Sequence, residues 1–215
     1  MTNYLKSIRD ENNNITFEKK VLNTCLVLLL GIFLGIFSKY LDNLEINNSI
    51  FFHRVVEKFD LNNFFSGMSI WLFIAILISV NSKSALRSAI NVFVFFIGMC
   101  SSYHLYTILY SGFNPRDYMM VWYTFTMISP ALAFICWYAK GEKVESIIIS
   151  ALILFVMISS CFNVGLWYFE LKSILELIVF ILTCYALYTK PINICLSIIF
   201  GLLLALFIRL PYISG

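Results

Sequence analysis

Seven apolar runs follow residue 20, and each is close to the roughly 20 residues that a helix needs to cross a bilayer. They cover residues 21–40, 64–81, 86–109, 117–139, 145–162, 171–188 and 191–212. Because backbone groups inside lipid must bond to one another, a spanning segment is either a helix or a strand of a closed barrel. Barrel strands would be short and alternating in polarity, whereas "VLNTCLVLLLGIFLGIF" is continuous. The sequence therefore predicts an all-α, polytopic transmembrane helical bundle of about seven spans, or six if one of the two marginal runs, 64–81 and 145–162, does not cross.

The composition agrees with lipid as the main solvent. Hydrophobic residues make up 60% of the chain and charged residues 13%, whereas a soluble domain has about 45–50% and about 25%. The net charge of +3 is spread along the chain and forms no concentrated basic face, so we predict a lipid bilayer and no nucleic acid as partner. Residues 1–20 are polar and predict a cytoplasmic tail that is interfacial or disordered. Residues 21–215 predict a single transmembrane domain.

Lysine and arginine in the connections predict the orientation, because cytoplasmic loops carry an excess of both. With the N-terminus inside, nine of these residues fall on the cytoplasmic side and six on the outer side. The nine are Lys6, Arg9, Lys19, Lys20, Lys83, Arg87, Lys140, Lys143 and Lys190. We therefore predict a multi-pass protein of the cell membrane with a cytoplasmic N-terminus and an extracytoplasmic C-terminus.

The longest connection, residues 41–63, contains an amphipathic pattern. Phe52, Val55, Val56 and Phe59 share one face of a helix, and charged residues fall largely on the other. This pattern is typical of a helix that lies on a membrane surface. We predict such a helix over residues 50–61, on the outer side.

Motifs of known intramembrane enzymes and metal sites are absent from the sequence. The six cysteines contain no CxxC pair, and His53 and His104 are the only histidines, so no HExxH motif exists. Ser66 and Ser69 in "FFSGMSIW" do not have the spacing of a rhomboid serine. Neither a phosphate-binding glycine-rich loop nor a haem motif is present. We therefore predict no metal, no cofactor and no catalytic residues.

Polar and aromatic residues gather in the outer half of the predicted bundle. Polar groups at membrane depth are costly and mark functional sites. Two interpretations stay open: an aromatic belt with charges that reach the interface, or an outward-facing pocket with polar anchors between aromatic walls. In the second, we expect His104 and Glu176 to face the bundle interior, near Arg209. The candidate ligand-binding residues are His104, Arg116, Trp122, Asn163, Trp167, Glu176 and Arg209.

Two local patterns concern the fourth run. In "NPRD", Asn114 predicts an N-cap, Pro115 the first helical position, and Asp117 a partner in a capping box. This explains Asp117 and leaves Arg116 free to face headgroups or a pocket. Pro130 predicts a kink that releases the carbonyl of Thr126.

Small residues form a stripe on the first run. Gly31, Gly35 and Ser38 in "GIFLGIFS" have the spacing that lets two membrane helices approach closely. The neighbour is either another helix of this chain or a separate membrane protein.

The stretches "GIFLGIFSKYLD", "GFNPRDYMMVWY" and "ISPALAFICWYAKGEK" resemble those of small polytopic membrane proteins of Gram-positive bacteria. The chain also resembles, more loosely, the substrate-binding subunits of energy-coupling-factor vitamin transporters. That resemblance implies an outward pocket and a first helix that docks a membrane partner, with Gly31 and Gly35 at the matching positions. The family has six spans and both ends inside, which differs from the seven runs here.

These observations lead to three expectations for function. The first is binding or transport of a small molecule from the extracytoplasmic side. The second is a role without transport, as a membrane partner subunit or an immunity-type protein. The third is an unfamiliar intramembrane enzyme.

Overall fold

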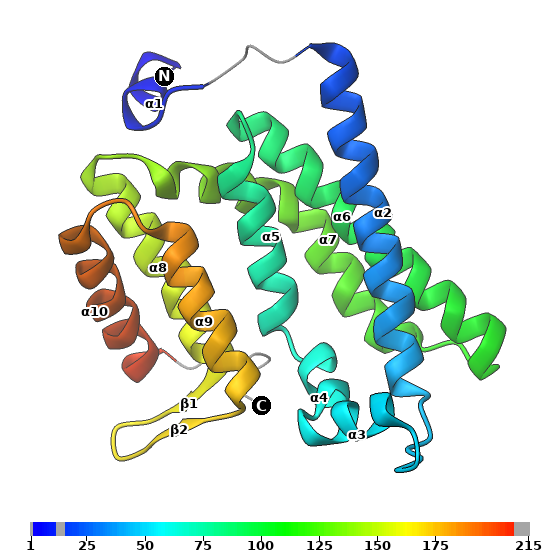
Figure 1. Cartoon of the computed structure of the whole chain (residues 1–215). Helices are drawn as coiled ribbons and strands as arrows, with labels where there is room; N and C mark the ends of the chain where they lie inside the picture. Colours follow the sequence, from blue (N-terminus) through cyan, green and yellow to red (C-terminus); the bar gives the residue numbers. More distant parts are fainter. Residues whose placement is uncertain (1, 12–15, 209–215) are drawn as a thin grey trace.

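The computed structural model describes residues 2–11 and 16–208, and most of them are helical. Each of the seven apolar runs contains one helix. These helices are α2 (Phe17–Asp42), α5 (Ser69–Asn81), α6 (Ala85–Tyr106), α7 (Arg116–Trp137), α8 (Val144–Cys161), α9 (Ile174–Leu187) and α10 (Pro191–Phe207). They run back and forth between two ends of the molecule (Figure 1). We call the end beside the N-terminal helix α1 (Thr2–Ile8) the α1 end, and the opposite end, which carries a two-stranded hairpin between α8 and α9, the hairpin end.

Within residues 2–11 and 16–208, four helical segments are long and apolar enough to cross a membrane. They are α2, α6 with its π-helical extension η1 (Thr107–Ser111), α7 with the 3-10 turn η2 (Tyr138–Lys140), and α8. The other apolar helices, α5, α9 and α10, have 13, 14 and 17 residues. At about 1.5 Å per residue they reach only about 20–26 Å, less than the roughly 30 Å of a hydrocarbon core. The fold class is therefore confirmed as helical and compatible with a membrane. The predicted seven spans are not confirmed, because only four of the segments are long enough to cross.

Helix α5 lies between two groups of helices. One hydrophobic cluster joins α5 to α2, α6 and α7 through buried residues that include Trp71, Phe95 and Met119. The other joins α5 to α8, α9 and α10 through residues that include Ile76, Leu154 and Val179. The two groups therefore share α5 as a common wall.

The small-residue stripe of α2 packs against α6. A Cβ atom added at Gly31 would lie 2.3 Å from the carbonyl oxygen of Phe95, and one at Gly35 would lie 2.4 Å from that of Met99. Ser38, the third member, is 3% exposed. A separate protein could reach these three residues only if α6 moved away.

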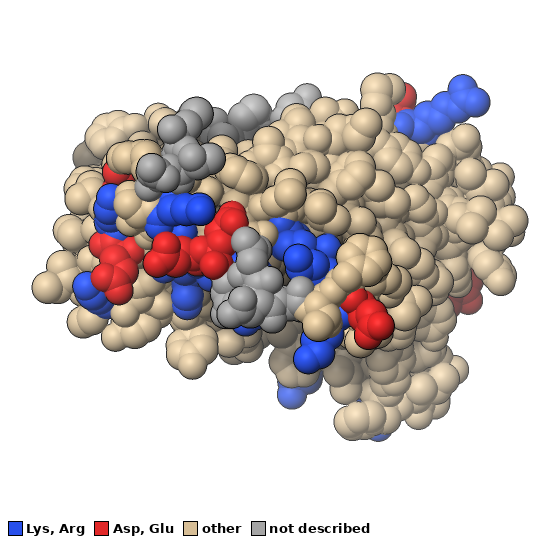
Figure 2. Space-filling view, turned by 90° about the horizontal axis from the view of Figure 1, so that it is seen from above, with Lys and Arg blue, Asp and Glu red and all other residues tan. Residues whose placement is uncertain are grey.

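The polar tail begins with a helix that packs against the bundle. Helix α1 (Thr2–Ile8) was not expected within an interfacial or disordered tail. Ile8 is buried against Ala85, Trp137 and Tyr138, at the α1 end. Charged side chains of both signs gather over this end, seen from above in Figure 2. Helix α2 then begins at Phe17, four residues before the predicted span.

The hairpin end carries short elements. A helix is found in the segment predicted to form a surface helix: α3 (Phe51–Lys58), which is shorter than the predicted 50–61, buries Val56 and is followed by α4 (Leu61–Ser66). Asp60, with φ of 48°, separates the two helices. An antiparallel hairpin of β1 (Phe162–Val164) and β2 (Phe169–Leu171) joins α8 to α9. The prediction of an all-α chain missed this small sheet.

The start of α7 differs from the predicted cap. The helix begins at Arg116 after Pro115, with no capping hydrogen bond from a side chain. The predicted N-cap, Asn114, is wrong because its side-chain oxygen accepts a hydrogen bond from His104 instead. Within α7, the Thr126 carbonyl that Pro130 leaves free accepts a hydrogen bond from the Ser129 hydroxyl at 2.9 Å. The helix thus satisfies the released carbonyl with its own side chain.

Candidate functional site

A pocket of about 590 Å³ lies at the hairpin end, and we call it the polar pocket. It is bordered by α4 and the connection to α5, by the first half of α7, by the end of α8 and by the start of α9. Both α5 and α9 are short and begin at this end, side by side. The lining residues are Asp60, Asn63, Phe64, Ser66, Gly67, Met68, Tyr118, Val121, Trp122, Phe125, Ser160, Lys172, Ser173 and Glu176.

Glu176 is the most buried charged residue of this pocket. It lies in the first turn of α9, where its backbone N–H donates to the hydroxyl of the N-cap residue Ser173 at 3.3 Å. Its side chain approaches the backbone at Gly67, since a Cβ added there would lie 3.8 Å from Oε1. The residue is 7% exposed, and Oε2 is buried without a hydrogen-bond partner among the described residues. Burying a carboxylate oxygen without a hydrogen-bond donor raises the free energy of the folded protein, so a bound molecule that interacts with this atom would be stabilising.

One face of α7 supplies an aromatic wall to the same pocket. Tyr118, Trp122 and Phe125 follow one another at helical spacing. The Trp122 ring lies 6.3 Å from Tyr118 and 6.5 Å from Phe125. Trp71 of α5 packs behind Trp122 edge to face, and its indole N–H donates to the Phe65 carbonyl. The wall is therefore held in place by α5 as well as by α7.

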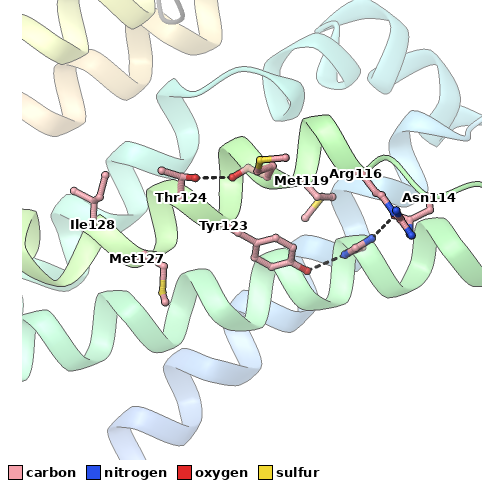
Figure 3. A pocket seen from close by; sticks show the side chains of 9 residues that line it. Asn114, Arg116, Met119, Tyr123, Thr124, Met127 and Ile128 are labelled. Atoms are coloured by element: carbon pink, nitrogen blue, oxygen red, sulfur yellow. Dashed lines mark hydrogen bonds between the residues drawn. The ribbon is translucent and has the colours of Figure 1, made fainter.

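A second, shallower site lies along α6 and α7, and we call it the α6–α7 groove (Figure 3). It has a volume of about 500 Å³ and is lined by His104, Asn114 and Arg116 at one end. The rest is lined by three methionines and by Tyr123, Thr124 and Ile128. His104 Nε2 lies 2.9 Å from Asn114 Oδ1, and Nδ1 lies 2.8 Å from the Tyr123 hydroxyl. With Nε2 as the donor to Asn114, neutral His104 accepts from Tyr123, so both ring nitrogens are used within the protein.

The predicted site residues thus divide between two places. Trp122 and Glu176 meet in the polar pocket, and His104 and Arg116 meet in the α6–α7 groove. The expected approach of His104 to Glu176 is not seen. Asn163 pairs with Glu170 in the hairpin, and Trp167 is 96% exposed near its tip. Arg209 lies outside the described residues.

Several lining residues were missed by the sequence reasoning. Asp60 and Lys172 lie in connections, where spacing gives no sign of what they face. Tyr118 and Phe125 could have been found, because they fall four before and three after Trp122 on the same helical face. The sequence therefore held a signal for the aromatic wall but not for the charges opposite it.

A buried ion pair lies next to the polar pocket. Lys39 Nζ lies 3.6 Å from Asp42 Oδ2 at the end of α2, and the Tyr103 hydroxyl donates to the same carboxylate oxygen at 2.7 Å. Ser66, which lines the pocket, donates to Asp42 Oδ1 at 3.4 Å. This cluster fixes α2 to α6 beside the pocket wall.

Comparison of the chain with protein-family models, with curated proteins and with solved structures finds no match in any of the three.

Proposed function

We propose that this is a multi-pass protein of the cell membrane that binds a small polar molecule in the polar pocket from the extracytoplasmic side. The observation that carries the proposal is Glu176, whose buried Oε2 atom has no hydrogen-bond partner among the described residues, in a pocket of about 590 Å³. Pockets of this size that combine apolar walls with a few polar groups are the usual sites for small molecules. The aromatic wall and the charges of Asp60, Lys172 and Glu176 give this combination.

The proposal includes seven crossings. The short helices α5 and α9 begin next to the pocket, where α4 and the hairpin cover the depth that they do not reach. The hairpin and the connections around α4 are not helical, and backbone of this kind is tolerated at membrane depth when it is buried in protein or lines a cavity. The third short helix, α10, packs along α8. A thinner local bilayer or a tilt accommodates its length.

The orientation in the proposal places the hairpin end outside. The α1 end carries the connections with Lys83, Lys140, Lys143 and Lys190, which supports a cytoplasmic location for that end. The pocket then opens to the extracytoplasmic side.

Binding is favoured over permeation by the packing beyond the pocket. Between the pocket and the α1 end, α5 is packed on both sides by the two hydrophobic clusters. A transport pathway would have to separate these clusters. A binding role needs no such rearrangement.

Cysteine labelling in whole cells tests the proposal. Val121 lines the pocket, whereas Ile135 is exposed on the same helix and lines neither of the two sites. With Cys25, Cys184 and Cys195 replaced by serine, Val121→Cys should react with a membrane-impermeant maleimide added outside. Ile135→Cys should not react, because it faces lipid. If Val121→Cys stays unlabelled while a cysteine at the exposed residue 167 reacts, the pocket is closed to the outside and the proposal fails.

A further inference from the structure

The charge balance of the polar pocket indicates which class of molecule it takes. Asp60 and Glu176 contribute two negative charges and Lys172 one positive charge, so the lining carries a formal charge of −1. The Glu176 carboxylate is the buried part of that charge, and its Oε2 atom has no hydrogen-bond partner among the described residues. A ligand with one positive charge would neutralise the pocket and give the Glu176 carboxylate a counter-charge.

The aromatic wall strengthens this reading. A cation within about 6 Å of an aromatic ring is attracted by the negative face of the ring, most strongly by tryptophan. Trp122, which is 9% exposed, lies between Tyr118 and Phe125, and Phe64 of α4 lines the same pocket. Three aromatic residues on α7 and a carboxylate on α9 together form the kind of site that recognises organic ammonium groups.

Other ligand classes fit this lining less well. An anion would approach two carboxylates and a single ammonium group. A bound metal ion needs several oxygen, nitrogen or sulfur ligands close together. Among residues 2–11 and 16–208, no group of three or more His, Cys, Asp and Glu side chains has that arrangement.

We propose, on the basis of the function proposed above, that the polar pocket binds a small organic cation. Glu176 provides the counter-charge and Tyr118, Trp122 and Phe125 provide the aromatic wall. The ammonium group lies between the Glu176 carboxylate and the Trp122 ring.

The test uses choline, tetramethylammonium and 3,3-dimethylbutan-1-ol, a neutral compound with nearly the same shape as choline. The full chain in lipid nanodiscs is titrated with each compound while the midpoint of thermal unfolding and the heat of binding are recorded. We expect both cations to bind and to raise the midpoint. The neutral compound should bind at least about tenfold more weakly, since a desolvated charge pair contributes more free energy than a tenfold change in affinity requires.

Two variants distinguish the contribution of the Glu176 charge to binding from that of the aromatic wall. Glu176→Gln keeps the shape of the side chain and should lower the affinity for both cations at least about tenfold. Its midpoint without ligand should be unchanged or higher, because a buried charge without a partner is removed. Phe125→Leu keeps an apolar side chain and should reduce the preference for choline over the neutral compound. Glu57→Gln, the same change on the exposed face of α3, is the matched control and should bind both cations normally.

Equal affinity for choline and the neutral compound, or undiminished cation binding by Glu176→Gln, would overturn the inference. Failure of both cations to bind would also overturn it. The labelling of Val121→Cys separates these results from a failure of the proposed function. If the pocket is labelled from outside and the cations do not bind, only the cation inference falls, whereas an unlabelled pocket refutes the proposed function itself.

Discussion

The guanidinium group of Arg9 lies 4.3 Å from the centre of the Trp137 ring and donates a hydrogen bond to the carbonyl oxygen of the same residue at 2.5 Å. A second bond from Arg9 reaches the carbonyl of Val80 at 2.9 Å. These carbonyls belong to the last turns of α7 and α5, where backbone acceptors lack partners within the helix. A cation at helix C-termini is also favoured by the helix dipoles. Arg9 therefore joins the N-terminal segment to two helix ends.

Replacing Arg9 should destabilise the folded protein. Burial lowers the pKa of the Arg9 guanidinium, but an arginine stays charged in proteins. Arg9→Ala removes two charged hydrogen bonds and the ring contact, and we expect a loss of about 2–3 kcal/mol in the free energy of unfolding. The midpoint of thermal unfolding of purified protein measures this loss. The stability of Arg9→Lys should lie between those of the unaltered protein and Arg9→Ala, because lysine keeps the charge but lacks the planar guanidinium group with its several donors.

Lys6→Ala is the matched control for Arg9, since Lys6 is an exposed basic residue of α1, three residues before Arg9. It should leave the midpoint unchanged. If Arg9→Ala and Lys6→Ala behave alike, the docking of α1 does not stabilise the bundle.

Replacing glycine by alanine in α2 should destabilise the protein, although alanine is the better helix former by about 1 kcal/mol. At Gly35 the new Cβ would lie 2.4 Å from the Met99 carbonyl oxygen, so α2 and α6 must separate. We expect Gly35→Ala to cost about 1–3 kcal/mol, as overpacking does in other cores. Leu30→Ala, at an exposed position of the same helix, should cost much less. Thermal unfolding of the two variants in the same detergent compares them directly.

Cysteine labelling at one connection from each end of the molecule tests the predicted orientation, and the structure selects the positions. Ser84 is a poor labelling site because it is buried and its hydroxyl accepts the N–H of Arg87, whereas Lys83 beside it is exposed. Gly112 has a φ of 70°, which disfavours a cysteine, whereas Trp167 is 96% exposed at the same end of the molecule. Trp167→Cys should therefore react with an impermeant maleimide outside the cell, and Lys83→Cys only after permeabilisation. The reverse pattern would place the polar pocket on the cytoplasmic side.

Sequence reasoning located the helices better than it located the site. Continuous apolar runs determine where helices form in lipid, and each run contains one. Position along a span gives the depth of a residue but not the side of the bundle that it faces. His104 and Glu176 were therefore placed together at one depth, whereas the structure puts them in separate sites.

Polar contacts between residues far apart in the chain also could not be predicted from the sequence. Asn114 precedes a proline in a form typical of an N-cap, but the His104 ring competes for its side-chain oxygen. Arg9 reaches carbonyls 71 and 128 residues away, and no local pattern predicts such partners. The local rules apply to isolated helix ends, and both cases depend on tertiary neighbours.

The last prediction concerns the ion pair of Lys39 and Asp42. Their side chains are 9% and 20% exposed, and the nitrogen–oxygen distance is 3.6 Å. Removing one partner of a fully buried pair costs about 3–5 kcal/mol, mostly because the other charge stays buried alone, and the partial exposure of Asp42 reduces that cost here. Asp42→Asn should therefore lower stability more than Tyr103→Phe, which removes only the hydrogen bond to Asp42 and should cost about 1–2 kcal/mol. The double variant Lys39→Met with Asp42→Asn should recover most of the loss, since no unpaired charge remains. Thermal unfolding of Lys39→Met, Asp42→Asn and the double variant measures this coupling, and simple additivity of the two single changes would show that the pair does not act as a unit.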